Sequence, residues 1–174
     1  YLGFMATKSE FVRKMPGRIV GATVDKDNTR GFVLTLQARE QHIRREKATS
    51  NICSNEALCA LRSLLYISLI GKQGFCELAA LNYQKSEYLK GLLDKVPGVT
   101  VKRSSPTFNE FTVLLSKNAD EVVHAMIEKG FACGFPLGRF YKGMDNYLLV
   151  AATEKRTKEE MMKFADSLEV VLCS

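Results

Sequence analysis

The residues best suited to chemistry form a short polar run that precedes a segment of helical periodicity. The run contains three cations, two hydroxyls and an amide: Arg44, Arg45, Lys47, Thr49, Ser50 and Asn51. The free N–H groups and the dipole of a helix start favour an anion, and guanidinium and hydroxyl groups donate hydrogen bonds to phosphate. The run therefore predicts one of two roles. Either it contacts a phosphate, which the cations attract electrostatically, or its polar side chains cap the helix while the charged groups are simply exposed to solvent.

Self-contained catalysis is not indicated. The two histidines are His42, in the same polar region without an evident partner, and His124, within an amphipathic pattern typical of surface packing. A Gly-rich phosphate loop, a zinc signature and a nucleophile elbow are all missing from the sequence. The five cysteines are odd in number and form no Cys-x-x-Cys pair, which favours reduced, buried thiols. We predict no catalytic residue and no metal site.

Composition and charge limit which partners are possible. The 174 residues are 46% hydrophobic and 25% charged, enough for one domain or two small ones. The net charge of +6 is uneven, with cations concentrated before residue 48. A solvated basic surface, a site for an anionic cofactor group or acidic partner, and a nucleic-acid surface all remain open. Nucleic acid is the least favoured because no aromatic-interleaved motif accompanies the cations.

Neither a membrane span nor a leader is expected. The longest apolar run, Leu64 to Ile70, is interrupted by Ser68 and closed by Gly71, well short of the ~20 residues that cross a bilayer. The first residues lack the basic flank and cleavage pattern of a secretory signal. We expect a cytoplasmic chain without a membrane partner.

Strands and a hairpin are predicted at the start of the chain. Residues 1–6 have the pattern of a buried strand, and residues 18–24 and 31–36 that of a loose hairpin around a turn at residues 25–28. Residues 37–54 are polar and without periodicity. Loops of this length in compact domains are usually functional or covered by a partner.

Two helices are expected next. The first runs from Asn55 to a C-terminal glycine, Gly71, and is apolar around most of its circumference, which predicts burial on most sides. The second runs from about Gly74 to Lys95 and ends at Pro97-Gly98.

The remainder predicts a small α+β unit. Strands are expected at residues 99–102, 109–115, 131–135 and 147–153, and helices at 119–129 and 157–171, the last with a Thr157/Glu160 capping box. This order suggests a small antiparallel sheet with helices on one face. A domain boundary is expected between residues 72 and 96.

Three segments resemble a known family. They are Lys14-Met15-Pro16-Gly17-Arg18-Ile19-Val20-Gly21, the long run from Gly31 to Cys53 that includes Gln37-Ala38-Arg39-Glu40-Gln41-His42-Ile43-Arg44-Arg45, and Thr153-Glu154-Lys155-Arg156-Thr157. They are similar to the glycine decarboxylase family, the P-protein of the glycine cleavage system, and within it to subunit 1 of the split bacterial enzyme. The likeness covers nearly the whole chain, and the family subunit is considerably longer.

The resemblance implies a fold class. It is α/β, with α+β character in the carboxyl-terminal half, in the architecture of fold-type-I pyridoxal phosphate-dependent transferases. Residues 1–71 would then be the remaining strands and a helix of the large domain. Residues 72–174 would be a bridging helix and the small carboxyl-terminal α+β domain with its antiparallel sheet.

The resemblance also implies an activity and partners. The family decarboxylates glycine on pyridoxal phosphate and transfers the aminomethyl group to the lipoyl group of H-protein, a glycine dehydrogenase (aminomethyl-transferring) reaction. In the split enzyme, subunit 2 holds the cofactor lysine, so this chain would be an accessory part of a heterotetramer and inactive alone. By loop position in related enzymes, Thr49, with Ser50 and Asn51 beside it, is expected to contact the cofactor phosphate across the subunit interface.

One departure supports an accessory role. Many relatives of this fold use an arginine on a late strand to bind the substrate carboxylate, whereas residues 147–153 carry no charge. An autonomous pyridoxal phosphate enzyme, such as an aminotransferase, remains the alternative.

Overall fold

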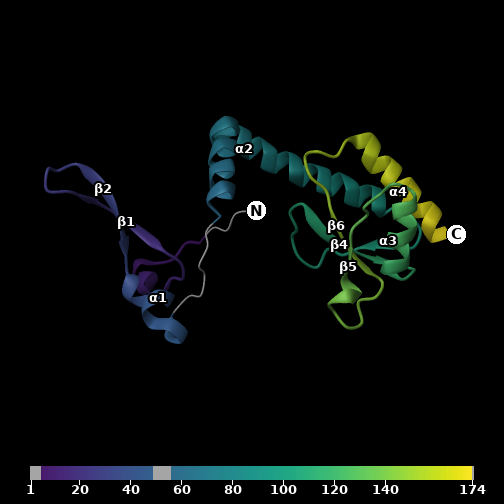
Figure 1. The fold of residues 1–174 in the computed structure, drawn as a ribbon. Coiled ribbons are helices and arrows are strands. Elements are labelled where there is room, and N and C mark those ends of the chain that lie inside the picture. Colours follow the sequence, from purple (N-terminus) through teal and green to yellow (C-terminus); the bar gives the residue numbers. More distant parts are fainter. Residues whose placement is uncertain (1–4, 49–55, 174) are drawn as a thin grey trace. The chain divides into compact units, whose positions relative to one another are not determined.

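The computed structural model describes residues 5–48 and 56–173, and the chain divides into two compact units, Tyr1–Leu69 and Ile70–Ser174. Figure 1 shows the order of the elements, and each unit is described by itself. The strand expected at residues 1–6 lies mostly outside the described residues, and the described Met5 and Ala6 belong to no strand.

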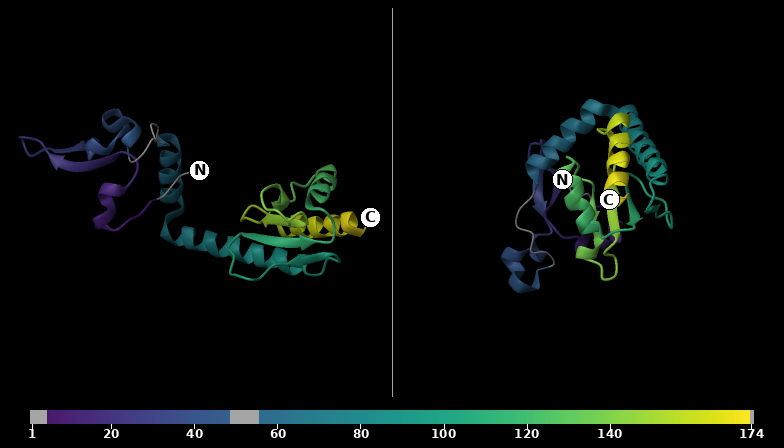
Figure 2. Two further views of the ribbon diagram at one scale, coloured as in Figure 1. Left: turned by 90° about the horizontal axis from the view of Figure 1, so that it is seen from below. Right: turned by 90° about the vertical axis from the view of Figure 1, so that its right-hand side faces the viewer.

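The first unit contains the predicted hairpin. After a short 3-10 helix, Ser9–Lys14, strand β1 (Ile19–Val24) pairs antiparallel with β2 (Arg30–Thr35). The turn is closed by Asp25, whose carboxylate accepts hydrogen bonds from the N–H groups of Asp27 (2.8 Å) and Thr29 (2.9 Å). Such local bonds are the reason that aspartate favours turns. The hairpin prediction is confirmed, and Figure 2 shows its two strands side by side.

The polar segment after the hairpin is not a plain loop. It forms three short helical turns, namely the 3-10 turns Gln37–Arg39 and Arg45–Lys47 with α1 (Gln41–Arg44) between them. Each turn is too short to be stable alone. Their positions must therefore be held by contacts outside their own backbone hydrogen bonds.

Helix α2 spans Ala57–Leu93 but is interrupted at Gly71, whose backbone (φ 69°, ψ 178°) is not helical. The glycine stop predicted there is confirmed. The expected burial of the first half is wrong for this chain, since Leu58, Leu61, Leu64 and Leu65 are exposed and Leu69 is 87% exposed. The physical reason is that no described element packs against this half with enough apolar area to cover it.

By length and composition alone, α2 could cross a membrane, but one such helix is only weak evidence for a membrane span. The apolar half before Gly71, residues 57–70, is about 21 Å long at ~1.5 Å per residue. A bilayer core is about 30 Å thick. The interruption therefore argues against a continuous span, and the absence of a membrane partner stays a prediction.

The second unit is the predicted α+β unit. Its sheet has the order β3-β4-β6-β5, from β3 (Val99–Val101), β4 (Glu110–Leu115), β6 (Tyr147–Ala151) and β5 (Phe135–Pro136), and all neighbours are antiparallel. Its helices are the second half of α2, α3 (Ala119–Glu128) and α4 (Lys158–Cys173), and a 3-10 turn, Leu137–Arg139, follows β5.

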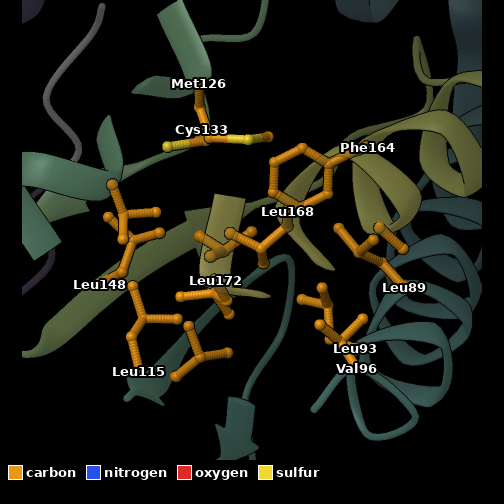
Figure 3. Packing of buried hydrophobic residues seen from close by; sticks show 14 of the residues in the cluster. Leu89, Leu93, Val96, Leu115, Met126, Cys133, Leu148, Phe164, Leu168 and Leu172 are labelled. Carbon is orange, nitrogen blue, oxygen red and sulfur yellow. The ribbon is translucent and has the colours of Figure 1, made fainter. Parts of the chain in front are cut away.

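One hydrophobic core holds this unit together (Figure 3). Leu89 and Leu93 from α2, Met126 from α3 and Leu168 from α4 belong to one buried cluster with sheet residues such as Leu148. Every buried hydrophobic residue of the cluster lies at position 89 or later. The described part of the first unit contributes nothing to it.

The last helix starts as the sequence predicted. The N–H of Thr157 donates to Glu160 Oε2 (2.9 Å), and the N–H of Glu160 donates to Thr157 Oγ1 (3.1 Å). This reciprocal pair is a capping box. It satisfies two N–H groups that the start of α4 would otherwise leave without a partner in the chain.

The strand expected at residues 131–135 is shorter, because β5 is only Phe135–Pro136. The N–H of Phe131 still donates to Met126 O at the end of α3 (2.9 Å), and Phe131 packs edge-on against Phe164 with ring centroids 5.7 Å apart. Residues 131–134 return the chain from the helix into the core, and only Phe135 and Pro136 pair with β6.

Polar residues on the second half of α2 fix the loop that follows β6. Asn82 Oδ1 accepts from the N–H of Glu154 (3.0 Å), and Lys85 Nζ donates to the carbonyls of Glu154 and Arg156. These contacts hold the 153–157 segment, one of the three that carry the family resemblance. The buried α2 positions are therefore partly polar for a structural reason.

Cys133 provides a direct test of this core. Burial raises the pKa of its thiol to about 11, so at pH 8 the thiol stays protonated, with only ~0.1% as the reactive thiolate. We expect iodoacetamide to modify exposed Cys76 in the folded chain and Cys133 only after unfolding. Peptide mass spectrometry measures both rates, and equal rates in the folded chain would contradict the packing described.

Candidate functional site

A cavity of about 260 Å³ lies at the base of the β1–β2 hairpin. Its lining residues are Arg18, Leu34, Thr35, Gln37, Glu40 and His42. A guanidinium, an imidazole, a carboxylate, an amide and a hydroxyl thus line one cavity. Arg18 and His42 are separated by the whole hairpin in sequence, so their proximity depends on the strand pairing.

The hairpin register brings these residues together. Ile19 pairs with Thr35, and Thr35 Oγ1 donates to the carbonyl of Ile19 (2.9 Å). Arg18, which precedes β1, is thereby set beside the residues that follow β2. Leu36 then adopts a left-handed backbone (φ 55°, ψ 29°). This conformation is uncommon for a residue other than glycine, and it turns the chain from the strand into the first helical turn.

Arg39 and Glu40 fix this turn from inside. Arg39 Nη2 donates to the carbonyl of Gly17 (2.8 Å), and the Arg39 and Glu40 side chains are only 11% and 9% exposed. Arg39 Nη2 and Glu40 Oε1 are 4.0 Å apart, a distance at which the charges attract without a short hydrogen bond. Arg39 thus ties the Pro16-Gly17 turn to the segment that carries His42.

Arg39 also has unused hydrogen-bonding capacity. Its Nε and Nη1 are buried and have no hydrogen-bond partner within residues 5–48 and 56–173. Buried guanidinium N–H groups are costly to leave unpaired. Such a group is typical of a site that is completed by further residues or by a bound anion.

The predicted cationic run lies next to the cavity in sequence and is open to solvent. Arg44, Arg45 and Lys47 are exposed, and none of them has an ion pair with another described residue. Arg45 has an unusual backbone (φ 52°, ψ −121°). Strained backbone in a non-glycine residue is often found at functional sites.

The remaining predicted contacts cannot be placed. Thr49, Ser50 and Asn51 lie outside the described residues, as does Cys53. Their contact with a phosphate stays a prediction.

Sequence reasoning missed most of the cavity. The sequence alone does not indicate Arg18 or Glu40 as site residues, and it shows no partner for His42. The available signal was that all three fall within the segments that carry the family resemblance. His124 is exposed on α3, in agreement with the predicted surface position.

The arrangement is suited to binding an anion. Arg18 can donate to an anion, and the Gln37 amide can orient it. The lining contains no thiol and no lysine amine. Among the described residues, no group of three or more His, Cys, Asp or Glu side chains is placed to hold a metal ion.

Residues 1–168 match the family model "Glycine cleavage system P-protein". The chain is 56% identical over 170 residues to "Probable glycine dehydrogenase (decarboxylating) subunit 1" of Geotalea uraniireducens (strain Rf4), with 98% of this chain and 38% of that protein covered. It is 51% identical over 168 residues to the protein of the same name in Maridesulfovibrio salexigens, with 97% and 38% covered. The chain thus spans about two fifths of the length of these relatives.

Solved structures agree. The crystal structure of "glycine decarboxylase (P-protein) of the glycine cleavage system, in inhibitor-bound form" superposes with a TM-score of 0.86 at 44% identity, covering 96% of this chain and 38% of that one. A NifS-like protein from Rickettsia africae has a TM-score of 0.54 at 14% identity over 75% of this chain, a likeness of fold alone. The α/β fold class is confirmed, and the fold-type-I architecture is consistent with it.

Proposed function

The chain belongs to the glycine cleavage system P-protein family, and on this premise we propose that it is the carboxyl-terminal part of a glycine dehydrogenase (decarboxylating) subunit 1. In this role it supports decarboxylation of glycine on pyridoxal phosphate held mainly by subunit 2, and aminomethyl transfer to the lipoyl group of H-protein. The cofactor, when bound, supplies the electron sink. We place the complex, a heterotetramer, in the cytoplasm, and the chain alone is inactive.

The observation that carries this proposal is the exposed cationic turn, Arg44, Arg45 and Lys47, which follows the cavity residue His42 in sequence. Arg44, Arg45 and Lys47 are exposed and without ion pairs among the described residues, although each could be satisfied by an anion. Arg18 and His42, which line the cavity, offer further nitrogen atoms that could donate hydrogen bonds to an anion. A phosphate-bearing cofactor fits these donors, while the described lining of the cavity contains no thiol and no lysine amine. This division of labour is what an accessory subunit requires.

The two units support the proposed domain assignment. We assign residues 1–71 to the end of the large domain and residues 72–174 to the bridging helix and the small domain. The second unit has a core of its own, whereas the apolar first half of α2 is uncovered. A helix that is apolar on all sides belongs in a larger interior, and the relatives are more than twice as long as this chain.

An autonomous pyridoxal phosphate enzyme is less well supported. It would need a free lysine amine and a group for the substrate carboxylate. Lys90 Nζ is held by Glu87 Oε1 (2.5 Å) and Thr107 Oγ1 (2.6 Å), and Lys85 is engaged with backbone carbonyls. Strand β6 carries no charge. Both lysines thus have structural roles.

The proposal is tested by reconstitution. Full-length subunit 1, subunit 2 and lipoylated H-protein are mixed with pyridoxal phosphate, and exchange between bicarbonate and the glycine carboxyl is measured. We expect exchange only when both subunits are present, because neither contains the complete site. Exchange of equal rate with subunit 1 and H-protein alone would refute the accessory role, and a mixture as inactive as its parts would refute the assigned activity.

A further inference from the structure

The backbone on both sides of Arg18 is held by side chains from distant positions in the sequence. The carbonyl of Gly17, before it, accepts a hydrogen bond from Arg39 Nη2 (2.8 Å), and the carbonyl of Ile19, after it, accepts one from Thr35 Oγ1 (2.9 Å). Gly17 has a left-handed backbone (φ 82°), which glycine adopts without steric cost. Arg18 therefore has a defined backbone position at the cavity, although it lies just before strand β1.

This arrangement leaves the Arg18 side chain available. Arg18 lines the cavity, is exposed, and has no ion pair with a residue in the ranges 5–48 and 56–173. Its guanidinium offers five N–H donors in a fixed geometry that suits phosphate. The carboxylate in the described lining is that of Glu40, and it is the group that could compete with an anion for Arg18.

Arg39 lies next to that carboxylate. Arg39 Nη2 and Glu40 Oε1 are 4.0 Å apart, and the two side chains are almost completely buried. A buried carboxylate is costly without a nearby positive charge, and Arg39 supplies this charge. If Arg39 were neutral, the negative charge of Glu40 would attract the Arg18 guanidinium and repel an anion in the cavity.

Arg39 itself does not line the cavity. Its contacts are with Gly17 and Glu40, while its Nε and Nη1 are buried without a partner in the described part of the chain. Such unsatisfied groups lower stability, and departures of this kind are expected at functional sites more than in ordinary packing. Arg39 is thus placed to act on the cavity through its neighbours.

We propose that Arg39 is a positioning residue of the candidate anion site. Through Gly17 it fixes the backbone of Arg18, with Thr35 holding the other side, and its charge keeps Glu40 from pairing with the Arg18 guanidinium. The anion is a phosphate monoester, which Arg18 contacts and Arg39 does not. This inference rests on the proposed function and deepens it, because a donor that is already in position binds its ligand more tightly.

The test is a double-mutant cycle on the complex of full-length subunits 1 and 2, in which equilibrium dialysis measures the Kd of pyridoxal phosphate. Arg18→Gln removes a charged donor and is expected to raise Kd about 30-fold. Arg39→Gln is expected to raise Kd about tenfold by misplacing Arg18. Because Arg39 acts through Arg18, the double variant should match Arg18→Gln within about threefold, whereas independent effects would multiply to about 300-fold.

Further variants separate positioning from folding. Arg39→Lys keeps the charge and one donor for the Gly17 carbonyl, so Kd is expected to rise less than about threefold, since this bond is not bidentate. Arg103→Gln is the matched control, because Arg103 is half-exposed and paired with Asp94 in the second unit, and a change below about threefold is expected. The thermal midpoint of cofactor-free subunit 1 is measured for each variant.

A second variant carries the test if Arg39→Gln does not fold. Thr35→Val keeps the shape of the side chain and removes only the bond to the Ile19 carbonyl. It is expected to raise Kd about fivefold in the wild-type background and to have no further effect beside Arg18→Gln. Multiplying effects of Thr35→Val and Arg18→Gln would then overturn the proposal.

The outcomes distinguish the inference from the proposed function. Wild-type affinity in Arg39→Gln, with weakened affinity in Arg18→Gln, overturns the positioning role and leaves the proposed function standing. Losses that multiply in the double variant, or equal weakening by Arg39→Lys and Arg39→Gln, also overturn it. Unchanged affinity in Arg18→Gln removes the anion from this cavity, and with it the role of Arg39. A wild-type complex that does not retain pyridoxal phosphate overturns both the inference and the proposed function.

Discussion

Reversing two charges of the cationic turn, Arg44→Glu with Arg45→Glu, is expected to weaken pyridoxal phosphate retention by the two-subunit complex at least about hundredfold. A hydrogen bond to a charged group contributes roughly 1.5–3 kcal/mol, and the new carboxylates would repel a phosphate. Both side chains are exposed and unpaired among the described residues. The substitutions therefore remove positive electrostatic potential from the proposed phosphate site without breaking a contact between described residues.

The measurement is equilibrium dialysis of the complex against pyridoxal phosphate, followed by its absorbance. The matched control reverses two exposed lysines of the second unit, Lys129→Glu with Lys142→Glu, and equal weakening there would show a net-charge effect only. Thr49→Ala refines the result. Loss of one phosphate hydrogen bond predicts roughly 10- to 100-fold weaker retention, whereas a helix-capping role leaves retention unchanged and lowers stability by about 1 kcal/mol.

Phe111→Ala is expected to lower the free energy of unfolding of the second unit by about 3–5 kcal/mol. Phe111 is 1% exposed on β4, within the hydrophobic cluster of the second unit. Its truncation leaves a cavity and removes the ring over which the buried Lys90 ammonium lies, 5.3 Å from the ring centroid. Mutation of such a residue combines lost burial with lost support for a charge.

Urea unfolding followed by far-UV circular dichroism measures this change, and amide exchange at Val113 and Leu148 assigns it to the second unit. Phe108→Ala is the control, because Phe108 is 51% exposed just before the same strand, and an effect within about 0.5 kcal/mol is expected. Similar losses for both variants would contradict the burial difference on which the prediction depends.

The sequence was most informative where local chemistry decides the structure. The hairpin around Asp25, the interruption at Gly71 and the capping box of Thr157 and Glu160 all follow from interactions between residues close in sequence. Residues 131–135 were harder to predict, because the end of α3 and the packing of Phe131 compete with strand pairing. Local propensity does not show which of these contacts prevails.

The candidate site shows the same division. The cationic run and its resemblance to the P-protein family were visible from residues alone, and the comparisons confirm the family. The cavity was not visible, because Arg18 and His42 meet only through the hairpin register and the buried Arg39 contact with Gly17. Burial of the helix before Gly71 was predicted from composition, yet burial depends on what packs against a helix and not on the helix alone.

By itself, the sequence determined the family, the order of most elements and the basic character of the amino-terminal segment, since these depend on residue types and short spacings. The tertiary structure decided which side chains share a cavity. It also decided that the core forms within the second unit. Those properties arise from pairing and packing between distant residues, whose free energy exists only once the chain has folded.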